Sequence, residues 1–97
     1  MPTYVVLSKF TDQGRSDVKH TSDRLNQLAP VAQQLGVKVV ANVITMGAYD
    51  VVTVLEAKDD ATIAGVIATL MSRGFVTTQT MRGFTIEEFA QVTAALS

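Results

Sequence analysis

The sequence predicts an α+β fold of the ferredoxin-like type, a βαββαβ antiparallel sheet followed by a C-terminal helix. Short runs rich in β-branched and aromatic residues alternate with amphipathic stretches of helical period. The second and third of these runs are separated only by the turn Met46–Asp50, which predicts a hairpin. Right-handed crossovers then give the spatial strand order 4-1-3-2, with both helices on one face.

The predicted strands span residues 3–10, 37–45, 50–57 and 75–84. The first three carry apolar side chains at both odd and even positions, so we expect both faces of the sheet to be apolar. In the second strand, simple alternation places Val37, Val39 and Val43 on one face. It places Val40 and Ile44 on the other face. A sheet with one face in water alternates apolar and polar residues. Something must therefore cover the second face.

The first helix is predicted to begin at Thr21 or Ser22 and to end at Gly36, after a polar loop or loose helical turn over residues 11–19. Pro30 lacks an amide donor, and its ring meets the carbonyl of Asn26. We therefore expect a kink there, or a split into two short helices.

The second helix is predicted to follow an Asp59 cap and to end at Gly74. Residues 85–88, Thr-Ile-Glu-Glu, form a capping box that opens a C-terminal helix. Its apolar stripe is Ile86, Phe89, Ala90, Thr93 and Leu96. We expect this helix to cover part of the second sheet face. A second copy, in a homodimer or higher homo-oligomer, is the simplest cover for the rest.

Composition excludes several function classes. The net charge is −1 and no basic run exists, so neither nucleic acid nor a membrane is an expected partner. No run approaches the ~18 apolar residues of a membrane span, and the N-terminus lacks a signal peptide pattern. We expect residues 1–97 to form a single cytoplasmic domain. With one histidine, no cysteine and no acidic cluster, no metal or cofactor is expected.

Connectivity brings several reactive side chains to one end of the sheet. The candidate ligand-binding residues at this end are His20, Arg24, Tyr49 and Asp50. Tyr4, in the first strand, is a fifth candidate. Asp50 is either a turn residue that accepts amide hydrogen bonds or a general base, and Tyr49 either packs beside the hairpin or donates from its phenol. His20 is either solvated or a base or haem ligand. We predict that Asp50 contacts Arg24, His20 or the amides of residues 11–19.

The hairpin Gly47-Ala48-Tyr49-Asp50 and the strand Val51–Ala57 that follows it resemble the GYD-domain family, named for Gly-x-Tyr-Asp or a close variant. Residues 10–14 and 78–85 are similar to other segments of that family. Members commonly carry Asp-Ser-Pro-x-Arg before the first long helix, where this chain has Thr-Ser-Asp-Arg at 21–24. The resemblance implies a fold of the dimeric α+β barrel type, a superfamily of cofactor-independent monooxygenases, haem-using enzymes and ligand-binding modules.

Three functions are compatible with these observations. The first is a homo-oligomeric binding protein with an apolar ligand cavity between its sheet and a partner. The second is a cofactor-independent enzyme, monooxygenase- or cyclase-like, acting on a small aromatic or polyketide-like compound. The third is a structural assembly subunit. A cavity near Tyr4, Tyr49 and Asp50, lined by inward-pointing polar groups, would favour binding or catalysis over assembly.

Overall fold

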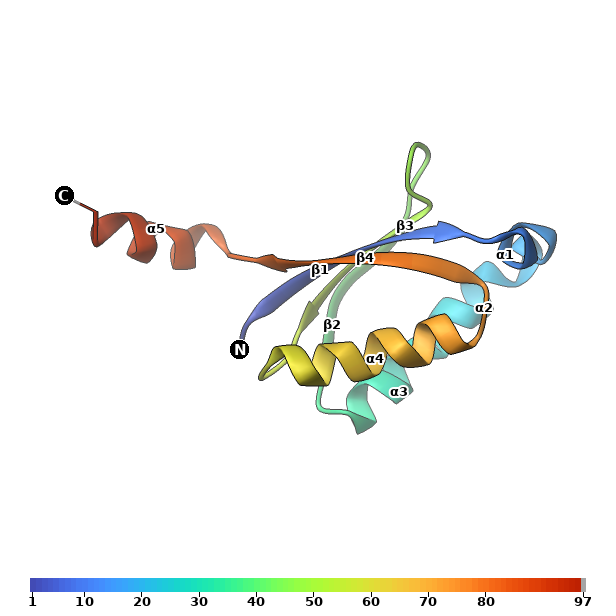
Figure 1. Cartoon of the computed structure of the whole chain (residues 1–97), viewed down its shortest axis with the longest axis horizontal. Helices are drawn as coiled ribbons and strands as arrows, with labels where there is room; N and C mark the ends of the chain where they lie inside the picture. Colours follow the sequence, from blue (N-terminus) through green and yellow to red (C-terminus); the bar gives the residue numbers. More distant parts are fainter. Residues whose placement is uncertain (97) are drawn as a thin grey trace.

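A four-stranded antiparallel sheet forms the centre of the computed structural model, which describes residues 1–96. The sheet order is β2-β3-β1-β4, as predicted from the sequence. The strands are β1 (Thr3–Phe10), β2 (Lys38–Ile44), β3 (Val51–Glu56) and β4 (Val76–Gly83). The helices that pack on this sheet lie on one side of it (Figure 1).

The segment between β1 and β2 is a chain of short helical pieces. They are α1 (Asp12–Ser16), the 3-10 helix η1 (Val18–His20), α2 (Thr21–Asn26) and α3 (Leu28–Gln34). Pro30 is the third residue of α3, and the break at Gln27 follows directly on Asn26, the residue whose carbonyl its ring would meet. The expected split is confirmed. The predicted caps Thr21 and Ser22 are wrong, because η1 leads directly into α2 and the Thr21 hydroxyl donates to the Val18 carbonyl.

The second long helix, α4 (Asp60–Ser72), is bounded as the sequence predicts. The Asp59 carboxylate accepts from the Thr62 amide, and Gly74 beyond the helix end adopts a φ of 80°. Helices α3 and α4 pack on the same face of the sheet (Figure 1). The residues that form the core between them and the sheet are Tyr4, Val6, Leu28, Ala32, Val37, Leu55, Ala57, Ile63, Val66 and Ile67.

A β-bulge in β2 changes which of its residues face the helices. The register pairs Val39 with Leu55 and Ala41 with Val54, so Val40 is an extra residue. Residues beyond the bulge are shifted by one, and Val43 therefore lies on the face opposite to Val39. The predicted faces for Val43 and Ile44 are wrong for this reason.

The other face of the sheet carries no helix, and we call it the open face. Strand register places on it the side chains that alternate with the buried ones. The apolar members of the open face are Val5, Leu7, Ala41, Val43, Val52, Val54 and Met81, and its other members are Thr3, Lys9, Lys38, Glu56, Thr77, Gln79 and Gly83. No helix among the described residues is long and apolar enough to cross a membrane.

Helix α5 (Ile86–Ala94) does not cover the open face. It continues from β4 away from the body of the molecule (Figure 1). Its apolar side chains stay in water, with Ile86 87% exposed and Leu96, just beyond the helix, 71% exposed. The expectation that this helix packs on its own sheet is wrong, and among residues 1–96 most of its apolar stripe stays exposed.

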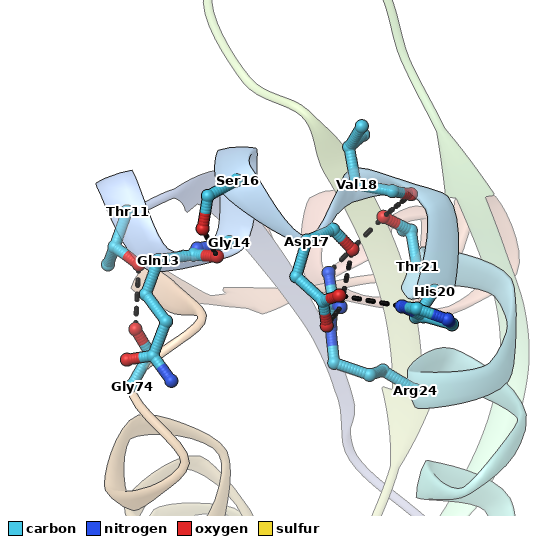
Figure 2. Close-up of polar contacts among 10 residues, drawn as sticks. All are labelled: Thr11, Gln13, Gly14, Ser16, Asp17, Val18, His20, Thr21, Arg24 and Gly74. Atoms are coloured by element: carbon cyan, nitrogen blue, oxygen red, sulfur yellow. Dashed lines mark hydrogen bonds and ion pairs between the residues drawn. The ribbon is translucent and has the colours of Figure 1, made fainter.

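Helix α1 is locked to the start of β4 by a close approach at Gly14. The Thr11 amide donates to the Phe75 carbonyl at 3.0 Å, and its hydroxyl donates to the Gly74 carbonyl at 2.6 Å (Figure 2). The Gly14 amide in turn donates to the Thr11 hydroxyl at 3.1 Å. A Cβ at Gly14 would lie 2.2 Å from the Phe75 carbonyl oxygen.

We therefore predict that Gly14→Ala lowers the free energy of unfolding by about 1–3 kcal/mol, as overpacking does. Gly65→Ala is the matched control, because no atom lies within 4 Å of the added methyl group and the site is inside α4. That change should raise stability by roughly 0.5–1 kcal/mol through helix propensity. Urea unfolding of both variants measures this. Equal effects at the two glycines would contradict the close approach.

Candidate functional site

The hairpin Thr45–Asp50 is tied to the end of β1 by Asp50. The Asp50 amide donates to the Ser8 carbonyl at 2.8 Å, and its carboxylate Oδ2 accepts from the Phe10 amide at 2.8 Å. The Asp50 carboxylate thus accepts from the Phe10 amide in the position where a backbone carbonyl would accept if β3 continued its pairing with β1. At the base of the hairpin the Thr45 amide donates to the Asp50 carbonyl at 2.8 Å. Gly47 in the turn has a φ of 151°, which L side chains rarely adopt.

Tyr49 reaches from the hairpin over one end of the open face. Its hydroxyl donates to Gln79 Oε1 at 2.9 Å, and the Lys9 ammonium lies 5.3 Å from the centre of its ring. Lys9 and Gln79 belong to β1 and β4, so the tyrosine spans the neighbouring strands. These three residues form a polar border at the hairpin end of the open face, next to Leu7 and Val52.

Arg24 and His20 belong to a separate cluster centred on Asp17. Figure 2 shows the Asp17 carboxylate between the two. Asp17 Oδ2 accepts from Arg24 Nη1 at 2.7 Å, and Asp17 Oδ1 lies 2.6 Å from His20 Nδ1. Arg24 also donates to the Asp17 carbonyl and to the Thr21 hydroxyl. Its guanidinium lies 4.3 Å from the centre of the Phe75 ring, so contacts on several sides hold the side chain.

The predicted contact of Asp50 with Arg24 or His20 is wrong. Asp17 satisfies both of those side chains, while Asp50 is bonded to the Phe10 amide, one residue before the segment 11–19. The hairpin and the helical segment do share the same end of the sheet, as connectivity predicts. At that end, Asp50 of the hairpin binds the Phe10 amide, whereas Arg24 and His20 bind Asp17.

The Asp17 cluster perturbs two titrations. The hydrogen bond from His20, followed by its charge, lowers the pKa of the Asp17 carboxyl. The same contact with Asp17 raises the pKa of His20 above its ordinary value. The imidazolium is therefore favoured, which suits an ion-pair partner better than a general base.

Tyr4 lies on the helix-covered face, apart from Tyr49. It is buried, and its hydroxyl donates to Asp60 Oδ1 at 2.5 Å, a contact that raises the pKa of the phenol. The Arg82 guanidinium is 5.7 Å from the centre of its ring. These groups border a groove of about 350 Å³ that is open to solvent, between α4 and β4. Its lining residues are Tyr4, Asp60, Ile63, Ala64, Ile67, Thr80 and Arg82.

Two further hollows lie on the same side of the sheet. One, of about 40 Å³, lies beside Arg24 and Phe75, and the other, of about 430 Å³, lies between α3 and the start of β2. Tyr49 and Asp50 line none of these three hollows. The five candidate residues thus occupy three places, and the described residues 1–96 contain no group of three His, Cys, Asp or Glu side chains able to hold a metal ion.

Sequence reasoning missed Asp17 and Gln79 as members of these clusters, and it placed Lys9 at the hairpin end of the sheet without naming it as a contact of Tyr49. Asp17 precedes His20 by three residues and Arg24 by seven, a spacing that places the three on one side of a helical segment. The spacing could therefore have predicted that Asp17 pairs with His20 and Arg24. Lys9 and Gln79 are joined only through the strand register, which sequence alone does not supply.

Asp50→Ala leaves the Phe10 amide without its acceptor, so we expect the free energy of unfolding to fall by about 1.5–3 kcal/mol. Asp50→Asn keeps an oxygen acceptor and should lose less. Arg24→Ala shares no partner with Asp50, so the double variant should be additive within about 0.5 kcal/mol. Denaturant titrations of the single and double variants measure this. A larger coupling would show that the two side chains interact.

The raised pKa of His20 means that its contribution to stability is complete below its ordinary value of 6.5 and is lost as the pH rises through the raised value. The melting temperature difference between wild type and His20→Gln should therefore be largest near pH 5 and shrink towards pH 9. Asp17→Asn should abolish this pH dependence. A difference that is constant across the range would contradict the pairing.

Comparisons with known proteins agree with this architecture. A curated relative from Thermus thermophilus, named glutamine synthetase and cystathionine beta-lyase binding protein, is 37% identical over 89 residues, which cover 91% of this chain and 94% of the relative. The crystal structure of FFRP-DM1 superposes with a TM-score of 0.62 at 15% identity, covering 87% of this chain and all of that one. The crystal structure of TTHA0845, also from Thermus thermophilus, gives a TM-score of 0.57 at 23% identity, covering 88% and 95%.

The two structural likenesses establish the fold alone, because their sequence identities are low. The family assignment rests on the sequence: the family model for the GYD domain matches residues 4–93, which include the hairpin with Tyr49 and Asp50. This chain belongs to the GYD domain family.

Proposed function

We propose that this protein is a homo-oligomeric binding protein that associates with a metabolic enzyme and holds its own copies together through the open face. The observation that carries the proposal is the uncovered apolar surface of the open face. Its central strands contribute Val5, Leu7, Val52 and Val54, none of which has a helix above it. These four side chains are half-buried, and covering their remaining apolar surface contributes about 25 cal/mol per Å². A second copy provides that burial, and a symmetric pair covers the open face of both chains.

The border of the open face supports a ligand cavity between the copies as the finer form of this proposal. Tyr49, Gln79 and Lys9 place a phenol, an amide and an ammonium beside apolar side chains. Small-molecule sites commonly combine an apolar lining with a few such polar groups. A ligand held there would be apolar, with one polar or anionic end directed at Lys9.

The enzyme partner is proposed from the relative that shares 37% of its residues with this chain, which is named for binding glutamine synthetase and cystathionine beta-lyase. We propose that one of these two enzymes is the partner here. The contact we favour is the hairpin, which projects from the sheet (Figure 1). Met46 at its tip is 103% exposed, and methionine adapts to irregular apolar surfaces. The bonds of Thr45 and Asp50 hold the hairpin base in place.

The test is binding of purified glutamine synthetase and cystathionine beta-lyase to the immobilised chain. We expect one of them to bind, and Met46→Asp to weaken the affinity at least tenfold, about 1.4 kcal/mol. Met71→Asp, on α4 and 51% exposed, is the matched control and should leave the affinity unchanged. If neither enzyme binds, the enzyme partner is wrong. Equal losses in both variants would remove the hairpin as the contact.

A further inference from the structure

The C-terminal arm, residues 84–96, is built to point away from its own sheet. Phe84 packs edge-on against Phe89, with ring centres 6.4 Å apart, and the Arg82 guanidinium lies 4.6 Å from the centre of the Phe84 ring. Thr85 and Glu88 form a complete capping box. A hydrophobic pair that spans a helix start sets the direction in which the helix leaves the preceding chain. Local contacts therefore direct α5 outwards.

Apart from the contact of Phe84 with Phe89 and Arg82, the apolar stripe of the arm stays exposed. Its exposed members are Phe84, Ile86, Phe89, Val92 and Leu96, and none of the nine residues of α5 is buried. Isolated helices shorter than about 12–15 residues are marginally stable in water. A helix of this length gains lasting stability only when its apolar side is covered, so the arm requires a surface outside its own chain.

The dimensions of the chain show how much surface is in excess. The accessible surface is 6244 Å², whereas a folded monomer of 10.4 kDa exposes about 5400 Å². The Cα radius of gyration is 14.6 Å, compared with about 12.5 Å for a compact domain of 97 residues. The excess of roughly 800 Å² equals what one partner contributes to an interface of standard size.

We propose that the arm of one copy packs its apolar stripe on the open face of a second copy, and that the second copy returns the same contact. The inference rests on the homo-oligomer of the proposed function and specifies how it is built. Both unpartnered surfaces are present in every chain, and a reciprocal exchange closes as a symmetric dimer. The ligand cavity is then closed by a helix of the other copy, so the site is incomplete in a monomer.

Self-association of the full chain gives the first test. Phe89→Asp puts a charge in the middle of the stripe, whereas Gln91→Asp puts the same charge on the opposite side of α5. Light scattering should find the wild type and Gln91→Asp as dimers or larger assemblies at micromolar concentration, and Phe89→Asp as a monomer. Circular dichroism checks that all three are folded. A monomeric wild type, or an assembly unaffected by Phe89→Asp, overturns the exchange.

Crosslinking gives the second test, because the natural chain has no cysteine. Thr93→Cys on the arm is mixed with Val43→Cys, Val54→Cys or Met81→Cys, which sample β2, β3 and β4 on the open face. Mild oxidation should link the two different chains for at least one of these positions. Each single variant alone is the control. A link formed within one chain carrying both changes, or none at all three positions, overturns the exchange.

Both tests are read without an enzyme, so the two proposals fail separately. A monomeric wild type that still binds glutamine synthetase or cystathionine beta-lyase would overturn the exchange and leave the enzyme partner intact. An exchanged dimer that binds neither enzyme would do the reverse. If Phe89→Asp weakens enzyme binding without changing the assembly, the arm contacts the enzyme rather than a second copy, and the exchange is wrong.

Discussion

The constraint on which the structure depends is a sheet that is apolar on both faces and has helices for only one. In β1, Tyr4 and Val6 point to the helices and Val5 and Leu7 point away, and β3 repeats this alternation next to it. Helices α3 and α4 bury the first set. The last helix, which could have covered the second set, leaves the body instead (Figure 1). The chain therefore buries one face of its sheet and leaves the other uncovered, a condition typical of a surface that binds another protein.

The hairpin that marks the family has a physical role at this boundary. Asp50 extends the hydrogen-bond ladder of β1 by one acceptor, through its contact with the Phe10 amide. Tyr49, its neighbour, turns over the open face towards Gln79. Asp50 thus anchors the hairpin, and Tyr49, the residue before it, borders the open face. The polar border and the projecting turn are held together by a short, strongly bonded segment.

Sequence reasoning identified the correct end of the sheet and the wrong partners within it. Connectivity does bring Asp50 and Arg24 to the same end, because it depends only on the order of the strands. Which carboxylate Arg24 meets depends on the path of η1 and α2, which carries Asp17 to within 2.7 Å of the guanidinium. Opposite charges in one region have several possible pairings, and only side-chain geometry selects among them. Tyr4 lies elsewhere because it is near the start of β1, at the opposite end of the strand from Phe10, and points to the helix-covered face.

The sequence alone determined the features that act over a few residues, together with the strand order that connectivity implies. The split of the helix near Pro30 and the helix caps at Asp59 and Thr85 each follow from steric or hydrogen-bonding rules local to the chain. Only the tertiary structure decided the bulge at Val40, which sends Val43 to the open face, and the outward direction of α5. The bulge depends on how β2 and β3 pair, which no local pattern encodes. The direction of α5 depends on the geometry of the Phe84–Phe89 contact, which only the folded chain shows.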